Sequence, residues 1–276
     1  LAIDMGGYQL SMELAENPLI GRYAGIVAAS VFGCTIVFTI PVGMGLIEEG
    51  DRPVFAKGIM LGLAAMPAAL ITGGAVCGLG IGEILHQNLP VLVLALLLGI
   101  GLFRIPDGMV KGFEVFAVLI RTVITAGLVL AAVTYMTGFV VIPGMAPIEE
   151  AMAVVSSIGV VLLGSLPVTE FLQRRLKRPC TALGARMGLD SISVLGLLVS
   201  IVSPIPALVM MKDMNTFGKL VNVAYMVSSA SMLAAHLGFT VSTEPDMLPA
   251  LLVSKLAGCT AAIALGFITS KTKKRL

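Results

Sequence analysis

Asp4-Met5-Gly6-Gly7 opens a stretch that is otherwise rich in Leu, Ala, Ile and Met and runs to Ile47. A carboxylate in apolar surroundings is costly unless it meets a partner, water or a cation. The glycine pair lets the backbone leave helical geometry and approach a ligand closely. The motif therefore indicates a substrate or ion site, with an acidic cap at an ordinary helix start as the alternative.

The chain repeats this pattern in its second half. Shifting the sequence against itself brings Asp4 onto Ser203, Gly7 onto Pro206 and Met12 onto Met211, and it brings Lys57 close to Lys255. Each copy has a short apolar arm, a helix breaker, a second arm that ends in charge, and two long apolar helices. Interrupted apolar segments at corresponding positions of two halves are typical of a transporter's binding site.

The composition indicates a membrane protein. Of the 276 residues, 57% are hydrophobic and 12% are charged, and the mean hydropathy is +1.01. Soluble domains carry about 25% charged residues, so we predict an all-α polytopic membrane protein. The net charge of +2 gives no sign of nucleic-acid binding.

The sequence predicts neither an enzyme nor a cofactor. The four cysteines are scattered, without the spacing of a disulfide framework or a zinc site. The chain has no GxSxG elbow, no GxxxxGK[ST] loop and no HExxH motif. It opens within an apolar arm without an initiator Met, which predicts a fragment that lacks its first helices.

Several segments are apolar over a length close to the roughly 20 residues that a bilayer requires. The predicted spans are Tyr23 to Ile47, Val54 to Leu79, Leu89 to Phe103, Phe113 to Met136, Glu150 to Leu172, Leu220 to Phe239 and Leu248 to Thr269. Glycines recur every fourth residue at Gly58 and Gly62 and again at Gly74, Gly78 and Gly82, a spacing that predicts close contacts between helices.

Lys and Arg alternate between loops up to residue 188, which places the basic loops in the cytoplasm. The alternation fails at Lys212 and Lys219, so the apolar segment from Leu189 to Met211 is predicted to enter and leave on the cytoplasmic side. Its tip would be Ser203-Pro204-Ile205-Pro206, where proline interrupts the helix. The predicted fold is therefore a pair of inverted-topology repeats with re-entrant (broken) helices. Repeat one covers 1–79, and the connecting helices cover 89–172. Inverted repeat two covers 189–270, and a basic cytoplasmic tail covers 271–276.

Two opposed hairpin tips would meet near the membrane midplane. Asp4 and the glycine turn would face the Ser203 tip, and no basic residue is expected near either tip. A carboxylate with freed carbonyls suits Na⁺ or a small ammonium compound. His236 follows Asn222 and Ser229 along one predicted span, and a structural, hydrogen-bonded histidine is the alternative to a functional one. The predicted substrate-binding residues are Asp4, Gly6, Gly7, Thr35, Ser203, Asn222, Ser229 and His236.

Five short stretches carry a family resemblance. They are Asp4-Met5-Gly6-Gly7 with Glu13-Leu14-Ala15, Thr35-Ile36-Val37-Phe38 with Ile40-Pro41-Val42, Ile47-Glu48 before Asp51-Arg52, Met210-Met211-Lys212 with Met214, and His236-Leu237-Gly238-Phe239. On these residues the chain resembles the ethanolamine utilisation membrane proteins, which are regarded as ethanolamine permeases. An acid often precedes the histidine in that family, whereas this chain has Ala235.

The resemblance implies passage of ethanolamine across the bacterial cytoplasmic membrane to feed ethanolamine catabolism. Asp4 would supply the counter-charge for the ammonium group, and Ser203, Asn222 or Thr35 would bind the hydroxyl. H⁺ and Na⁺ are candidate coupling ions, and a homo-oligomer is a candidate assembly. The alternatives are an ion-coupled carrier of another small metabolite and a membrane subunit of an ion-pumping enzyme complex.

Overall fold

The protein, seen in a computed structural model that describes residues 4–144 and 147–273, contains only helices and turns over those residues. Its long helices are α4 (Arg52–Val76), α5 (Ile81–Arg104), α6 (Pro106–Thr137), α7 (Ile148–Met187) and α12 (Leu248–Lys273). Among the described residues, 5 helical segments are long and apolar enough to cross a membrane, or 6 if the bent pair Arg174–Met187 and Ser191–Ser200 forms one span. This confirms the prediction of an all-α polytopic membrane protein.

The opening segment is a chain of short helices. They are η1 (Met5–Gly7), α1 (Tyr8–Leu14), α2 (Pro18–Arg22), the π-helices η2 (Tyr23–Gly33) and η3 (Thr35–Thr39), α3 (Ile40–Leu46) and η4 (Glu49–Asp51). Asn17 begins α2, because its side-chain oxygen accepts a hydrogen bond from the backbone N–H of Ile20 at 2.9 Å. Residues Pro18–Leu46 form one candidate span of 29 residues.

The second half also contains a run of short helices before a long one. They are α8 (Ser191–Ser200), α9 (Pro204–Met210), η5 (Met211–Asp213), α10 (Thr216–Ser229), α11 (Ala235–Thr243) and η6 (Pro245–Met247), followed by α12. Asn215 caps α10 as Asn17 caps α2, with its side-chain oxygen 2.6 Å from the N–H of Gly218. The 3₁₀ turn η6 precedes α12 as η4 precedes α4. The predicted break before Pro204 is present, and Ser203 caps the helix that follows it.

Three predicted boundaries were wrong. The span from Leu220 to Phe239 is broken, because α10 ends at Ser229 and α11 begins at Ala235. The basic segment 173–188, expected to be a loop, continues α7 as far as Met187, since Arg, Lys and Leu are good helix formers outside a membrane as well. Only Ile105 separates α5 from α6, where a longer loop was expected.

Helix α4 forms the centre of the molecule and packs against α12, α10 and α5. Its buried residues Phe55, Met66 and Leu70 belong to the largest apolar core. Gly58 and Gly62 face α10, where an added Cβ would meet Val223 and Val227, so this glycine spacing does mark a helix contact. The predicted stripe Gly74, Gly78 and Gly82 is not a helix face, because α4 ends at Val76 and Gly78 forms a turn with a φ of 85°.

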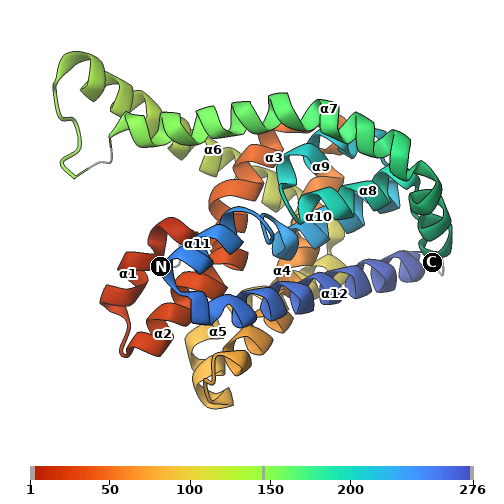
Figure 1. The fold of residues 1–276 in the computed structure, drawn as a ribbon, viewed down its shortest axis with the longest axis horizontal. Coiled ribbons are helices and arrows are strands. Elements are labelled where there is room, and N and C mark those ends of the chain that lie inside the picture. Colours follow the sequence, from red (N-terminus) through yellow and green to blue (C-terminus); the bar gives the residue numbers. More distant parts are fainter. Residues whose placement is uncertain (1–3, 145–146, 274–276) are drawn as a thin grey trace.

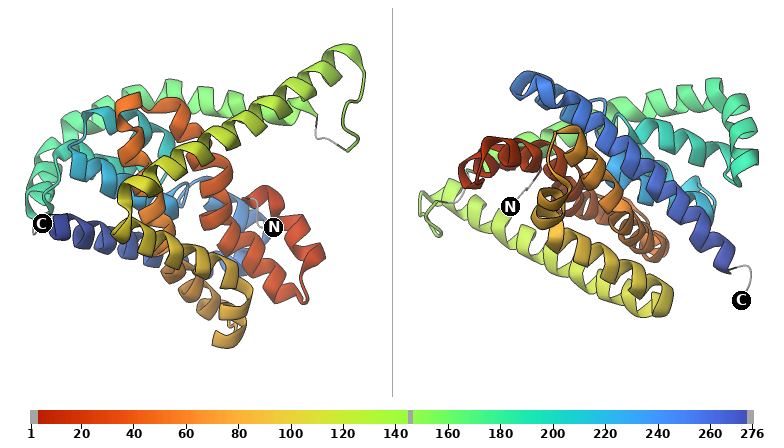
Figure 2. Two further views of the ribbon diagram at one scale, coloured as in Figure 1. Left: turned by 180° about the vertical axis from the view of Figure 1, so that it is seen from behind. Right: turned by 90° about the horizontal axis from the view of Figure 1, so that it is seen from below.

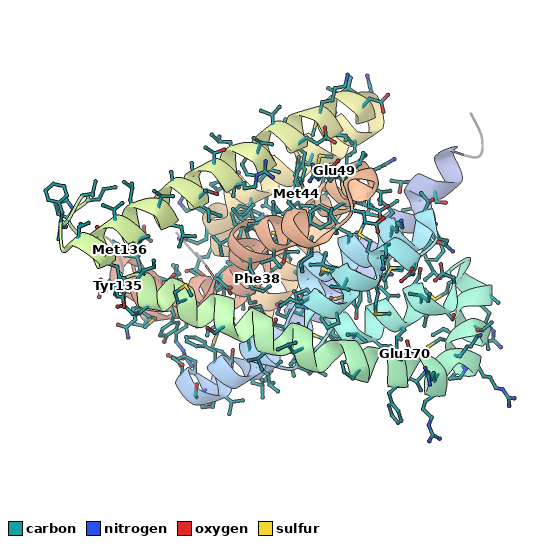
Figure 3. All side chains as sticks on the ribbon, turned by 90° about the horizontal axis from the view of Figure 1, so that it is seen from above. Phe38, Met44, Glu49, Tyr135, Met136 and Glu170 are labelled. Carbon is teal, nitrogen blue, oxygen red and sulfur yellow. The ribbon has the colours of Figure 1, made fainter. Side chains whose placement is uncertain are left out.

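Helices α6 and α7 extend together beyond the rest of the molecule, and the loop between them lies at the far end (Figures 1 and 2). Tyr135 and Met136 lie near that end of α6, while the segment with Phe38 and Met44 lies between the two helices (Figure 3). Most apolar side chains of α6 are exposed, including Val115 at 70%. An apolar exposed surface is what contact with lipid chains requires.

Candidate functional site

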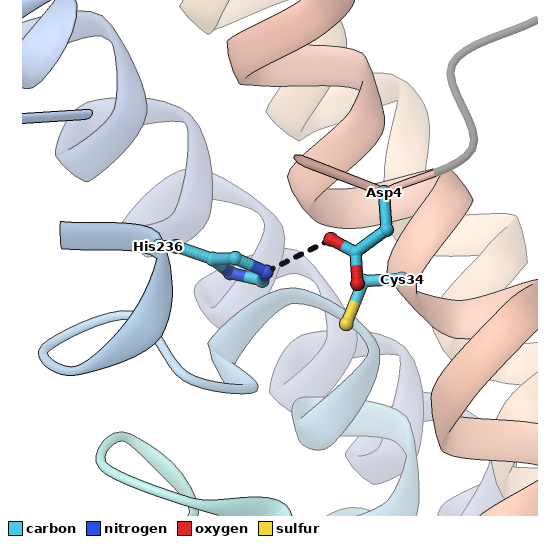
Figure 4. Close-up of side chains that lie close together, drawn as sticks. All are labelled: Asp4, Cys34 and His236. Carbon is cyan, nitrogen blue, oxygen red and sulfur yellow. Dashed lines mark hydrogen bonds and ion pairs between the residues drawn. The ribbon is translucent and has the colours of Figure 1, made fainter. Parts of the chain in front are cut away.

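Asp4 and His236 meet inside the protein, although they are far apart in the chain. Oδ1 of Asp4 lies 3.2 Å from Nε2 of His236 (Figure 4). His236 is 3% exposed, and the side chain of Asp4 is 29% exposed. The contact joins the cap residue of η1 to the first turn of α11, so it links the opening segment to the C-terminal part of the chain.

The backbone at Asp4 is strained. Its φ is 53° and its ψ is −171°, a combination that L residues rarely adopt and that costs roughly 1–3 kcal/mol. The glycines were expected to supply the unusual geometry, but Gly7 has a φ of −87°. The Asp4 carboxylate also accepts a hydrogen bond of 2.8 Å from the N–H of Met5 and thereby begins the short helix η1. The carboxylate is held in front of His236 by these hydrogen bonds.

Cys34 completes the group drawn in Figure 4. Its thiol, the Asp4 carboxylate and a ring nitrogen of His236 all lie within 4.8 Å of one another. Of the residues that the structure describes, these three are the group of ligand atoms close enough to hold a metal ion. The same carboxylate and imidazole can bind an organic ammonium group, and that use needs no metal.

A break between α10 and α11 positions His236. Ser231 has a φ of 55°, and its carbonyl oxygen accepts hydrogen bonds from the N–H groups of Ala234 and His236, both at 3.2 Å. The N–H of Leu233 bonds to the carbonyl of Ile201 at 3.0 Å, which ties this break to the break between α8 and α9. Two interruptions of the helical backbone therefore lie side by side, and both are partly exposed.

Lys255 lies at the same break. It projects from α12, is fully buried, and donates hydrogen bonds to the carbonyl oxygens of Ser30 at 3.0 Å, Ser228 at 3.1 Å and Ala230 at 3.1 Å. The sequence analysis expected no basic residue near either hairpin tip and did not consider the break between α10 and α11, where Lys255 lies. A lysine inside an apolar span is a functional candidate by that position alone, and this signal was present in the sequence.

Comparison with known proteins places the chain in a family. The family described as "Ethanolamine utilisation protein, EutH" matches residues 1–269. The chain belongs to this EutH family. It is 40% identical over 281 aligned residues to a Bacillus subtilis protein named YxeR, which carries no assigned function. That alignment covers 100% of this chain and 76% of the relative.

Three relatives carry a functional name. Proteins called probable ethanolamine permease EutH are 38% identical in Listeria monocytogenes and 36% identical in Escherichia coli. The first alignment covers 96% of this chain and 71% of the relative, and the second covers 97% and 72%. No solved structure gives a significant match. Both the family and the helical fold agree with a multi-pass protein of the bacterial inner membrane.

The other predicted site residues on the opening segment make hydrogen bonds to main-chain groups. The N–H of Gly7 bonds to the carbonyl of Asp4 at 3.0 Å, and Gly6 lies between them in η1. The hydroxyl of Thr35, which is completely buried, lies 2.7 Å from the carbonyl of Val31 and 3.3 Å from that of Val227. Thr35 therefore joins the π-helical segment to α10.

In the second half, Ser229 and Asn222 join α10 to α8, whereas Ser203 makes only a local contact. The Ser229 hydroxyl lies 3.2 Å from that of Ser200, at the adjoining ends of α10 and α8. The Asn222 amide donates to the carbonyls of Ser193 and Gly218, both at 2.9 Å. Ser203 precedes α9 as its N-cap and accepts a hydrogen bond from the N–H of Ile205 at 3.4 Å. Asp4 thus bonds to His236, and no described hydrogen bond joins it to the Ser203 tip.

Two clusters of ion pairs lie at opposite ends of the first candidate span, and sequence reasoning missed both. Near its start, Arg22 pairs with Glu244 at 2.8 Å and lies 3.9 Å from Asp246, while the Tyr8 hydroxyl is 2.5 Å from Glu244. Beyond its end, Lys219 pairs with Asp51 at 2.5 Å. Each cluster joins a residue of one half to the turn before the long helix of the other. Such pairings depend on the tertiary fold, which no local pattern reveals.

Proposed function

We propose that this protein carries ethanolamine across the bacterial cytoplasmic membrane and that the Asp4 carboxylate binds the ammonium group of the substrate. The contact between Asp4 and His236 is the observation that carries the proposed site. Relatives named as probable ethanolamine permeases support the choice of substrate. The substrate undergoes no chemical change in this proposal.

The chemistry of ethanolamine matches the Asp4–His236 pair. Near neutral pH its primary amine is mostly an ammonium ion, which donates hydrogen bonds to a carboxylate and compensates its charge. Its hydroxyl can either donate or accept a hydrogen bond. Because two carbons separate these groups, one molecule can bond to Asp4 through nitrogen and to the imidazole of His236 through oxygen. Binding then replaces the direct contact between the two residues.

The second part of the proposal is that 1–79 and 189–270 are inverted repeats that move against each other. The matching caps Asn17 and Asn215, and the 3₁₀ turns before α4 and α12, support an internal repeat. The ion pairs at the two ends of the first span support alternating closure of the two sides. Broken helices near the membrane midplane are the usual substrate sites of such transporters.

The decisive experiment measures uptake of radiolabelled ethanolamine into liposomes that contain the purified protein. In Asp4→Asn the side chain keeps its shape and tolerates a positive φ, but it loses its charge. We expect this variant to fold with an unchanged melting temperature and to lose at least about tenfold in uptake, since a charged hydrogen bond contributes roughly 1.5–3 kcal/mol.

Glu16→Gln is the matched control, because Glu16 is exposed and its neutralisation also removes one negative charge. It should transport like the wild type. Saturable uptake by both the wild type and Glu16→Gln, together with loss in Asp4→Asn, supports the proposal. Equal transport by Asp4→Asn removes the assigned role of Asp4. Absence of uptake by the wild type removes ethanolamine as the substrate.

A further inference from the structure

The ammonium group of Lys255 lies in a complete cage of main-chain oxygens. Lys255 is two turns into α12, and its side chain has no exposed surface. A lysine ammonium has three N–H donors, and the three acceptors at 3.0–3.1 Å use all of them. These three acceptors are uncharged main-chain carbonyls. Lys255 takes part in none of the salt bridges among the described residues.

The cage is built from both halves of the fold. Ser30 lies in the π-helix η2, whereas Ser228 and Ala230 lie where α10 ends. The last carbonyls of a helix have no intrahelical partner and carry partial negative charge. Converging main-chain carbonyls of this kind replace the hydration shell of a monovalent cation in membrane proteins. The cage therefore has the chemistry of a cation site, and a side chain of the protein itself fills it.

We propose that this cage is a monovalent-cation site that the Lys255 ammonium permanently occupies, and that the transporter consequently needs no external Na⁺ to bring its two halves together. This inference rests on the proposed transport function. Removing the ammonium takes a hydrogen-bond donor from three converging carbonyls, which is unfavourable in a dry interior. A small external cation, namely NH₄⁺, K⁺ or Na⁺, then takes the vacant place. NH₄⁺ should act best, because it reproduces the N–H donors of lysine.

The first test is the melting temperature of the purified Lys255→Ala protein in two kinds of buffer. One buffer contains NH₄⁺, K⁺ or Na⁺, and the other contains the bulky cation N-methylglucamine at equal ionic strength. We expect the small cations to raise the melting temperature of the variant by at least about 3 °C, because a ligand that binds only the folded state stabilises it. The wild type should melt equally in both buffers.

Two further variants serve as controls. Lys255→Met has a similar length but no charge, so its side chain fills the cage and its melting temperature should not depend on small cations. Lys212→Ala removes an exposed lysine near the same half of the fold and should melt like the wild type in both buffers. If Lys255→Ala folds and melts equally in all salts, the inference is overturned. Failure of Lys255→Ala to fold in every salt also overturns it, because an open cation site would be refilled.

Ethanolamine uptake provides an independent second measurement. Wild-type uptake should be the same with and without Na⁺, whereas uptake by Lys255→Ala should require NH₄⁺, K⁺ or Na⁺. Cation-dependent melting with no uptake by the wild type supports the cation site and removes the proposed function. Cation-independent melting with normal wild-type uptake leaves that function in place and removes the cation site. The two proposals can therefore fail separately.

Discussion

At the scale of the residue, the proposed binding of ethanolamine at Asp4 would make the substrate compete with His236 for the same carboxylate. A carboxylate that is partly withdrawn from water needs a hydrogen-bond donor. His236 supplies one at 3.2 Å when no substrate is bound. If the ammonium of ethanolamine takes that place, the imidazole must still be able to bond elsewhere, and the substrate hydroxyl provides the new partner.

This competition predicts different effects for two substitutions of His236. His236→Gln keeps an N–H donor at about the same reach, so we expect it to retain measurable uptake. His236→Phe keeps an aromatic ring and the packing but has no hydrogen-bonding group. Its uptake should fall by a further tenfold or more, because a lost hydrogen bond to a charged group costs roughly 1.5–3 kcal/mol. The measurement is initial uptake in liposomes at several ethanolamine concentrations, with melting temperatures as a check on folding.

The outcome that contradicts this role is equal uptake by the two variants at equal stability. The sequence was sufficient to single out Asp4 and His236, because each is a polar residue in an apolar segment. It could not predict that they touch, since their contact depends on the strained backbone at Asp4 and on the break at Ser231. Lys255 carried the same signal as a polar residue in an apolar span, but the sequence analysis did not single it out.

At the scale of the element, the close approach of α4 and α10 depends on glycine. A Cβ added to Gly62 would lie 2.7 Å from the carbonyl oxygen of Ala224, which belongs to the backbone and cannot move aside easily. Gly62→Ala should therefore force the two helices apart and cost about 1–3 kcal/mol, as overpacking does elsewhere. We expect the melting temperature to fall by several degrees.

Gly82→Ala is the matched control for that prediction. Gly82 is in the first turn of α5, and an added Cβ would meet nothing within 4 Å. Alanine is also the better helix former, so this variant should melt at the wild-type temperature or slightly above it. If Gly62→Ala melted like Gly82→Ala, the contact between α4 and α10 would be looser than the structure indicates.

Apolar length and proline positions predicted most elements, but not all their boundaries. The break before Pro204 was predictable because proline and the residue before it disfavour a continuous helix. The break after Ser229 was not, because Ser228-Ser229-Ala230-Ser231 contains neither proline nor glycine. There the backbone leaves the helix through Ser231, and its freed carbonyls bond to Lys255 from another helix. Such a tertiary partner is invisible to local patterns.

At the scale of the whole molecule, the two ion-pair clusters lie at opposite ends of the span Pro18–Leu46. Arg22 follows its start, and Asp51 follows its end. Pairing with Glu244 also explains how a basic residue can lie on the side that loop charges mark as external. In a carrier with alternating access, each cluster would close its own side of the membrane, so breaking one cluster should favour opening on that side.

Cys34 can report this opening, because its buried thiol lies within 4.8 Å of Asp4 and His236. In a protein whose other three cysteines are replaced by alanine, Glu244→Gln should raise the labelling of Cys34 by a membrane-impermeant maleimide from the Arg22 side. Asp51→Asn should raise it from the opposite side. We expect about a fivefold change in rate for each, the population shift that roughly 1 kcal/mol produces. Labelling is compared in right-side-out and inside-out vesicles.

Glu170→Gln provides the control for a general loss of rigidity, because it breaks an exposed ion pair with Arg174 on α7, away from both clusters. Its labelling should equal that of the parent protein on both sides. Ethanolamine should slow labelling wherever Cys34 has become accessible, since the substrate would occupy the adjacent Asp4. If Glu244→Gln and Asp51→Asn increased labelling from the same side, the clusters could not act as opposite gates, and the two halves would have to move in some other way.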